Sequence, residues 1–185
     1  HATTLGTDKV AETPMKAERG DRHVTVTRWV MDSPPPPFFV KAGGFDPNEN
    51  VDRWQHITWT PPAFVRLDVG AAKAGTGARE GDRSQGITMR NLNAITPETE
   101  NSTHYFWAQA HDFRINESWI TDLLVANVHT AFEEDLWIIK LQQENIDTGS
   151  NNPRIDINHD GGGLQAIRML ETMIEAESSN VQAAE

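Results

Sequence analysis

A helical period runs from Trp119 to Ile146 and predicts one long amphipathic helix. At about 100° per residue, one face of this helix is apolar over most of its length. Asp135 falls in the middle of that face, because six apolar side chains project within roughly 60° of it. These six are Leu124, Val128, Ala131, Phe132, Ile138 and Ile139.

A carboxylate on a core-facing stripe is costly unless it is paired with a cation, a hydrogen-bond donor or a metal. The neighbouring Glu133 and Glu134 are expected to point away from the stripe and to be solvated. A structural partner for Asp135, such as an arginine, a tryptophan or a backbone amide, is the commoner case, and a metal ion is the rarer one. The helix alone leaves both interpretations open.

The chain before this helix carries five strand patterns. They cover residues 23–31, 51–60, 63–70, 86–96 and 102–110. Most are joined by short turns, which is typical of an antiparallel sheet. Residues 1–22 show no period, whereas a shorter helix is expected over 164–176, followed by a frayed tail. Strands followed by helices predict a single α+β domain over residues 1–185, with the long helix across one face of a curved sheet.

Proline and glycine mark the irregular segments. The proline-rich run 33–37 predicts a stiff loop, and the apolar triplet Phe38–Val40 after it is either a lid or, as we favour, a loop anchor. Asn116 or Ser118 is expected to cap the start of the long helix, and Gly149 to end it.

Composition excludes several classes of function. A formal net charge of −11 and a pI of about 5.0 argue against nucleic acid or an acidic membrane as the partner. No apolar run approaches the roughly 18 residues that are needed to span a bilayer, and no leader segment is recognisable, so a soluble, cytoplasmic protein is expected. The chain has no cysteine, which excludes disulfides, thiolate nucleophiles and cysteine-bound metals. Any metal must be held by His, Asp, Glu or water, and no Gly-x-Ser-x-Gly motif indicates a serine hydrolase.

The histidines are ambiguous when they are considered one at a time. His104 lies between alternating strand residues and either faces a cavity or is a core histidine bonded to the backbone. His129 lies off the Asp135 face and is expected to be solvated. His1, as the first residue, carries little weight by itself.

Several motifs together resemble one known family. They are Thr96–Glu100 (TPETE), His104–Trp107 (HYFW), Glu134-Asp135 on the long helix, Gln142-Gln143, and Val51–Trp54 after the proline-rich loop. Together they resemble the catalytic domain of Rieske-type non-haem iron oxygenases, in the branch of vanillate O-demethylase, dicamba O-demethylase and toluenesulfonate methyl-monooxygenase. The resemblance covers almost the whole chain. It implies a helix-grip (Bet v 1/START-like) fold, in which a long C-terminal helix closes a curved antiparallel sheet.

The resemblance also implies a mononuclear Fe(II) site. In that family two histidines, five residues apart, and one aspartate on the later helix hold the iron, and Asp135 matches the aspartate. The segment His1–Gly6 resembles the stretch that begins at the second histidine, so His1 is the expected second ligand. The first histidine and a Rieske domain with a [2Fe-2S] cluster are expected upstream of this chain. The 185 residues alone are therefore expected to be inactive.

The family's activity is the hydroxylation or O-demethylation of a small aromatic acid with O2. Electrons come from NAD(P)H through a reductase or ferredoxin, and the intact family protein is a homotrimer. Asn93 resembles a position that contacts substrate. Further polar candidates on strands are Gln55, Arg66, Asn91 and His104. The residues alone leave a different class open, a helix-grip domain that binds a small molecule without catalysis.

Overall fold

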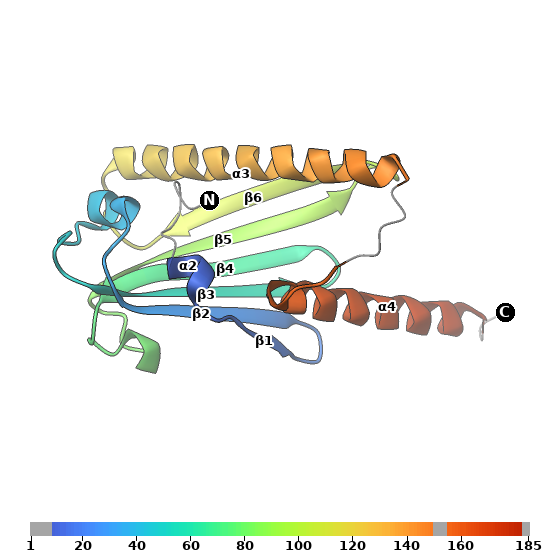
Figure 1. The fold of residues 1–185 in the computed structure, drawn as a ribbon, viewed down its shortest axis with the longest axis horizontal. Helices are drawn as coiled ribbons and strands as arrows, with labels where there is room; N and C mark the ends of the chain where they lie inside the picture. Colours follow the sequence, from blue (N-terminus) through green and yellow to red (C-terminus); the bar gives the residue numbers. More distant parts are fainter. Residues whose placement is uncertain (1–8, 150–154, 183–185) are drawn as a thin grey trace.

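The structure, a computed structural model that describes residues 9–149 and 155–182, contains one antiparallel sheet and two long helices (Figure 1). Each strand pairs with its neighbours in sequence, so the order is β1 to β6 without a crossover. The strands are β1 (Lys16–Arg19), β2 (Val24–Ser33), β3 (Val51–Thr60), β4 (Phe64–Lys73), β5 (Gly86–Pro97) and β6 (Thr103–His111). This confirms the predicted α+β class and the antiparallel sheet.

The helices follow the sheet in the chain. The long helix α3 spans Ser118–Asp147, and α4 spans Gly161–Gln182. Figure 1 shows α3 running along β6, while α4 begins near β2 and extends past the end of the sheet. Four short helical segments complete the described elements. They are α2 (Lys9–Glu12), the π-helical turn η1 (Phe39–Gly43), and the 3₁₀ turns η2 (Ala78–Glu80) and η3 (Asn158–Asp160).

The two ends of α3 differ in how well the sequence predicts them. Glu117 occupies the N-cap position, and it makes no side-chain capping bond, so neither Asn116 nor Ser118 is the cap. At the other end Gly149 adopts φ 69° and donates its N–H to the carbonyl of Ile146 at 3.0 Å. A positive φ after the last turn is the usual reason for a glycine there, so the predicted stop is confirmed.

Two elements were missed or shortened in the sequence-based prediction. Residues 1–22 were expected to be irregular, but 16–19 form the edge strand β1, which pairs with Val24–Thr27 of β2. Its sequence, KAER, is polar, and it is held by backbone pairing to β2 instead of by an apolar face of its own. The helix predicted over 164–176 runs from 161 to 182, so the expected frayed tail is helical as far as Gln182.

The main core lies between α3 and the face of the sheet that we call the inner face. This face carries Val51, Ala71, Ile87 and Met89, which pack against Ile120 and Leu124 of α3. Phe39 of η1 is 5% exposed and belongs to the same cluster, so the apolar triplet is a loop anchor, as favoured. Because side chains alternate along a strand, these residues define which other positions of each strand face inward.

Only the first half of α3 is covered. Its buried residues end at Ala131, whereas Ile138 and Ile139 are 55% and 59% exposed. The predicted continuous core-facing stripe around Asp135 is therefore wrong for the second half of the helix. Periodicity identifies the amphipathic face, but it does not report how far the sheet beneath that helix extends.

The opposite side of the sheet, which we call the outer face, has a smaller cluster of its own. Trp54 packs with Ala72 and Ala78, and its indole N–H donates to Asp68 Oδ1 at 2.9 Å. The Arg83 guanidinium lies 4.3 Å from the Trp54 ring centroid and 3.0 Å from Asp68 Oδ1. This cluster ties the loop before β5 to the sheet and includes His56, which is opposite Asp68 in the β3–β4 register.

Helix α4 contacts β2 through a glycine. A Cβ at Gly162 would overlap the Cγ2 atom of Val26, whereas a Cβ at Gly163 would meet no atom within 4 Å. Val26 pairs with Ile57 in the same register that pairs Val30 with Arg53, so it faces inward. Both long helices therefore lie on the inner face.

These adjacent glycines give a matched test of the α4 contact. Gly163→Ala should raise the free energy of unfolding by about 1 kcal/mol, because alanine is the better helix former. Gly162→Ala should lower it by about 1 kcal/mol, since overpacking against a stiff valine outweighs the same gain in propensity. Thermal unfolding of both variants measures the difference. Equal stabilisation by the two would contradict the close packing of α4 on β2.

His56 makes stability depend on pH. Burial, and next the charge of Arg83, lower its pKa from the ordinary value, although Asp68 opposes this. As pH falls below about 6.5, the unfolded chain takes up a proton that the folded chain refuses, so the free energy of unfolding decreases. Between pH 7.5 and 5.5 the melting temperature of His56→Gln should therefore decrease less than that of the parent. His129→Gln, whose side chain is 67% exposed, is the control. An identical slope for His56→Gln and the parent would be evidence against a buried neutral imidazole.

Candidate functional site

Unpartnered amides line the inner face of β5 and β6. Asn91 and Asn93 are 9% and 6% exposed, and they alternate with the core residues Ile87 and Met89. Gln109 stands opposite Asn91 in the register of β5 with β6. Within the part of the chain that the structure describes, the buried side-chain oxygens of all three have no hydrogen-bond partner. Buried polar atoms are almost always paired, so an unpaired group of three indicates a site for a polar ligand.

A second polar pair lies on the inner face of β2 and β3. Arg28 and Gln55 are direct neighbours in the register, and Arg28 Nη1 donates to Gln55 Oε1 at 3.2 Å. Burial lowers the pKa of Arg28 from its ordinary value. The predicted candidate Gln55 therefore faces the same side as Asn93.

Aromatic packing fixes the middle of α3 above β6. The Phe132 ring lies 5.2 Å from the Tyr105 ring and 5.7 Å from the Trp107 ring, both edge-on. Such pairs contribute beyond the area that they bury. Because Phe132 precedes Asp135 by less than one turn, this contact also positions the carboxylate. Partial burial, and next the Asp135 charge, raise the pKa of the Tyr105 hydroxyl.

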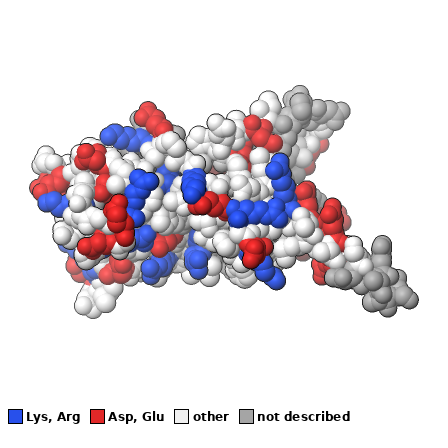
Figure 2. Space-filling model, turned by 90° about the horizontal axis from the view of Figure 1, so that it is seen from below, with Lys and Arg blue, Asp and Glu red and all other residues white. Residues whose placement is uncertain are grey.

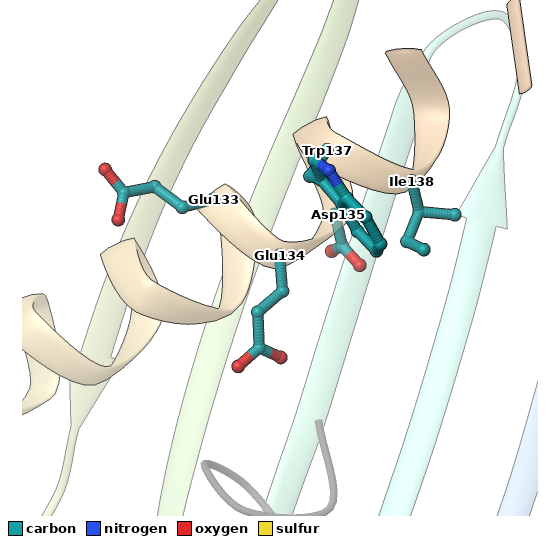
Figure 3. Close-up of a pocket in the computed structure, with 5 residues that line it drawn as sticks. All are labelled: Glu133, Glu134, Asp135, Trp137 and Ile138. Carbon is teal, nitrogen blue, oxygen red and sulfur yellow. The ribbon is translucent and has the colours of Figure 1, made fainter. Parts of the chain in front are cut away.

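Asp135 lies in an open pocket along α3. The pocket is lined by Glu133, Glu134, Asp135, Trp137 and Ile138. Figure 3 shows Glu134 and Asp135 on one side of the helix ribbon, with Glu133 pointing away. Glu133 is exposed, with its carboxylate 3.5 Å from His129, but Glu134 is half-buried, so the prediction that both glutamates are solvated fails for Glu134.

Burial and a neighbouring carboxylate both act on Asp135. Partial burial raises the pKa of Asp135, and the nearby Glu134 carboxylate raises it further. Two close carboxylates in a partly desolvated site are stabilised by a positive charge between or beside them. Among residues 9–149 and 155–182, however, no three His, Cys, Asp or Glu side chains lie close enough to hold a metal by themselves. The predicted ligand His1 lies outside the described residues.

Two other predicted residues lie on the wrong face. Tyr105 and Trp107 contact Phe132 of α3 and therefore face inward. Because side chains alternate along a strand, His104 and Phe106 face outward. His104 is half-exposed, and its Nε2 lies 3.5 Å from Glu98 Oε1. It is thus neither a cavity residue nor a core residue. Arg66 is exposed on the outer face of β4, opposite Leu92. The structure removes His104 and Arg66 from the candidate site.

The sequence-based prediction missed Arg28 and Gln109. Each occupies an ordinary strand position, and nothing in its local pattern distinguishes it from a solvated residue. These two residues can be identified as candidates only from the pairing of the strands. Arg28 is brought to Gln55, and Gln109 to Asn91, only once the register is known.

Comparison with known proteins identifies the family. The sequence profile of the vanillate O-demethylase oxygenase C-terminal domain matches residues 1–176. The chain belongs to this family. The resemblance inferred from the sequence motifs is thereby confirmed.

Curated relatives support the same family. The chain is 35% identical over 182 residues to a putative toluene-4-sulfonate monooxygenase system iron-sulfur subunit of Comamonas testosteroni, covering 96% of this chain and 52% of the relative. It is 33% identical over 181 residues to the vanillate O-demethylase oxygenase subunit of a Pseudomonas strain, covering 96% and 55%. The chain therefore spans about half the length of these relatives.

A solved structure confirms the fold. Dicamba monooxygenase bound to 3,6-dichlorosalicylic acid superposes with a TM-score of 0.81 at 21% identity, over 96% of this chain and 52% of that one. The predicted helix-grip arrangement, a long helix on an open antiparallel sheet, is thus the observed one. Within the described residues, no helix is long and apolar enough to cross a bilayer.

The unpartnered amides are expected to lower the stability of the fold. Asn93→Leu should raise the free energy of unfolding by about 1 kcal/mol, because it removes a carbonyl that lacks a partner in the described chain. Asn93→Asp should lower it, since a carboxylate would then be buried in the same place. Urea denaturation of both variants measures the effect. Comparable destabilisation by leucine would show that the Asn93 amide is already satisfied.

Proposed function

We propose that the chain is the catalytic domain of the oxygenase component of a Rieske-type non-haem iron monooxygenase. Its reaction is the hydroxylation or O-demethylation of a small aromatic acid. The observation that carries the proposal is the Asp135 carboxylate on α3, less than one turn after Phe132, whose ring packs on Trp107. Trp107 is opposite Asn93, one of the buried amides without a partner in the described chain. Family membership and the names of the relatives support the same reaction class.

Asp135 is the proposed carboxylate ligand of a mononuclear Fe(II). The donor is suitable, because oxygen ligands suit a divalent ion and a cation relieves the repulsion between Asp135 and Glu134. We propose His1 as the second ligand, and a histidine encoded upstream as the third. A site with two histidines and one carboxylate leaves positions on the iron for O2 beside the substrate.

The inner face binds and orients the substrate. Leu67 and Val69 of β4 offer an apolar surface for an aromatic ring, because they share the face of Ala71. Asn91, Asn93 and Gln109 stand beside that surface and hydrogen-bond the polar substituents. Fixing the ring in one orientation is the main contribution that these residues make to rate, since it places the reacting substituent toward α3.

We propose that the electron supply and the assembly are those expected for the family. A Rieske domain with a [2Fe-2S] cluster, encoded upstream, receives electrons from NAD(P)H through a reductase or ferredoxin, and the active unit is a homotrimer in the cytoplasm. The surface is consistent with a small-molecule substrate. Figure 2 shows basic and acidic side chains intermixed over the face seen from below, without the continuous basic area that nucleic acid requires.

A helix-grip domain that binds a ligand without catalysis is the second candidate. The amides of β5 and β6 would serve either function, because they need only a polar ligand. The two candidates differ at Asp135. An oxygenase needs this carboxylate to hold iron, whereas a simple binding domain needs it at most for a hydrogen bond.

Asp135→Ala separates these functions. In the protein expressed from its complete gene, occupancy of the mononuclear iron site should fall on the order of tenfold or more, and turnover with reductase should fall with it. Because the [2Fe-2S] cluster keeps its iron, the total iron content should fall by about one third. The fold should be retained, since Asp135 is exposed and lies beyond the covered half of α3. Metal analysis, circular dichroism and oxygen uptake measure the three quantities.

Glu133→Gln is the matched control for this experiment. It removes a carboxylate two positions away that is directed away from those of Glu134 and Asp135 (Figure 3), so iron and turnover should stay at parental levels. Full iron content in Asp135→Ala would reject the iron site, and ligand binding that persists without iron would favour the binding domain.

A further inference from the structure

We propose that Arg28, steered by Gln55, forms an anion-binding subsite on the inner face of β2 and β3, which holds the acid group of the ligand. The inference deepens the proposed function and rests on it. It assigns recognition of the ligand's negative charge to a residue of β2, three strand spacings away from β5, the strand that carries Asn91. The ligand class is an aromatic ring that bears a carboxylate or a sulfonate.

The first argument is the geometry of the guanidinium. Arg28 Nη1 donates to Gln55 Oε1 at 3.2 Å, which fixes one arm of the side chain. The Nε atom is buried and, among the described residues, has no acceptor. An Nε–Nη2 edge held in this way presents two parallel donors. That is the geometry with which arginine binds a carboxylate or a sulfonate through two hydrogen bonds.

The second argument is the lack of a counter-ion. The chain has 27 acidic and 16 basic residues, so carboxylates are in excess. Arg83 pairs with Asp68, and Arg114 pairs with Glu117. Arg28, by contrast, forms no ion pair in the described chain, and its neutral partner Gln55 cannot balance its charge. Burial without a counter-ion penalises the charged guanidinium, and an anionic ligand would remove that penalty.

The third argument is position. The register across the sheet runs from Arg28 through Gln55 and Val69 to Met89. The next inward-facing row runs through Ile57 and Leu67 to Asn91. Arg28 and the amide strand β5 are thus separated by three strand spacings, or about 14 Å between backbones. The intervening inner-face residues are apolar apart from Gln55.

This spacing suits one aromatic acid. The long Arg28 side chain and the Asn91 side chain both extend over the apolar residues and shorten the gap between their polar atoms. A ring on Leu67 and Val69 would direct its acid group to Arg28 and its remaining polar substituent to Asn91 or Asn93. The pairing of one charged and several neutral contacts would also fix which end of the ring faces each strand.

The test compares charged and neutral ligands of the same shape. Binding of vanillate, toluene-4-sulfonate and the neutral amide of each is measured by calorimetry with the protein expressed from its complete gene. The parent should bind each acid about tenfold or more tightly than its amide, as one charge-assisted contact predicts. Arg28→Gln should abolish this preference by weakening the acids and leaving the amides nearly unchanged. Arg28→Lys, which keeps the charge without the two-donor edge, should lie between them.

Arg66→Gln is the matched control. Arg66 also lies on a central strand, but on the outer face, so its removal should leave the preference for acids intact. Circular dichroism and melting temperature confirm that each variant is folded. Tight binding of the acids by folded Arg28→Gln would overturn the subsite, and so would an equal loss for acids and amides.

The outcomes distinguish this inference from the function on which it rests. If the parent binds neither acid, the aromatic-acid function fails and the subsite fails with it. If the parent binds and turns over an acid but Arg28→Gln retains the preference, the function stands and only the subsite is rejected. Which of the two acids binds more tightly identifies the anion as planar carboxylate or tetrahedral sulfonate.

Discussion

The contact of the first half of α3 with the sheet determines the rest of the arrangement. Ile120 and Leu124 are buried against β3, β4, β5 and η1, and Phe132 closes this contact on Tyr105 and Trp107. Beyond Phe132 the helix continues for four turns with exposed apolar side chains. Because helical backbone is stiff, the anchored half fixes the direction of the free half, and Asp135 lies in the first turn after the anchor. Its position is thus set by packing that does not include it.

The division of the sheet into two faces separates stability from binding. On the outer face, Trp54, Asp68 and Arg83 satisfy one another through a hydrogen bond, an ion pair and a stacked guanidinium. On the inner face, Asn91, Asn93 and Gln109 remain without partners in the described chain. A buried polar group without a partner costs free energy, and on the inner face a bound ligand can supply the missing hydrogen bonds.

The sequence predicts the elements better than it predicts the site. Alternation and helical period identify five of the six strands and α3, because these signals are local. The edge strand β1 escapes, since its polar residues pair through the backbone. The site depends on register, which a sequence read in order does not contain. The helical period places Asp135 on the apolar face of α3. For His104 a cavity position is one of the two alternatives predicted, but the inward-facing positions are those of Tyr105 and Trp107. A shift of one residue moves a strand side chain to the opposite face of the sheet.

Charge also constrains how the inner face can work. Glu134 and Asp135 lie on α3, which runs along β6, whereas Arg28 lies on the inner face of β2, near the other edge of the sheet. An anion placed between them would be repelled by the helix carboxylates and attracted by the guanidinium, so its charged group would point away from α3. A divalent cation at Asp135 would reverse the sign of the field at the helix. An acid group could then bind at either of two cationic sites. The two parallel donors of Arg28, held in place by Gln55, would favour the orientation in which the acid group lies at β2.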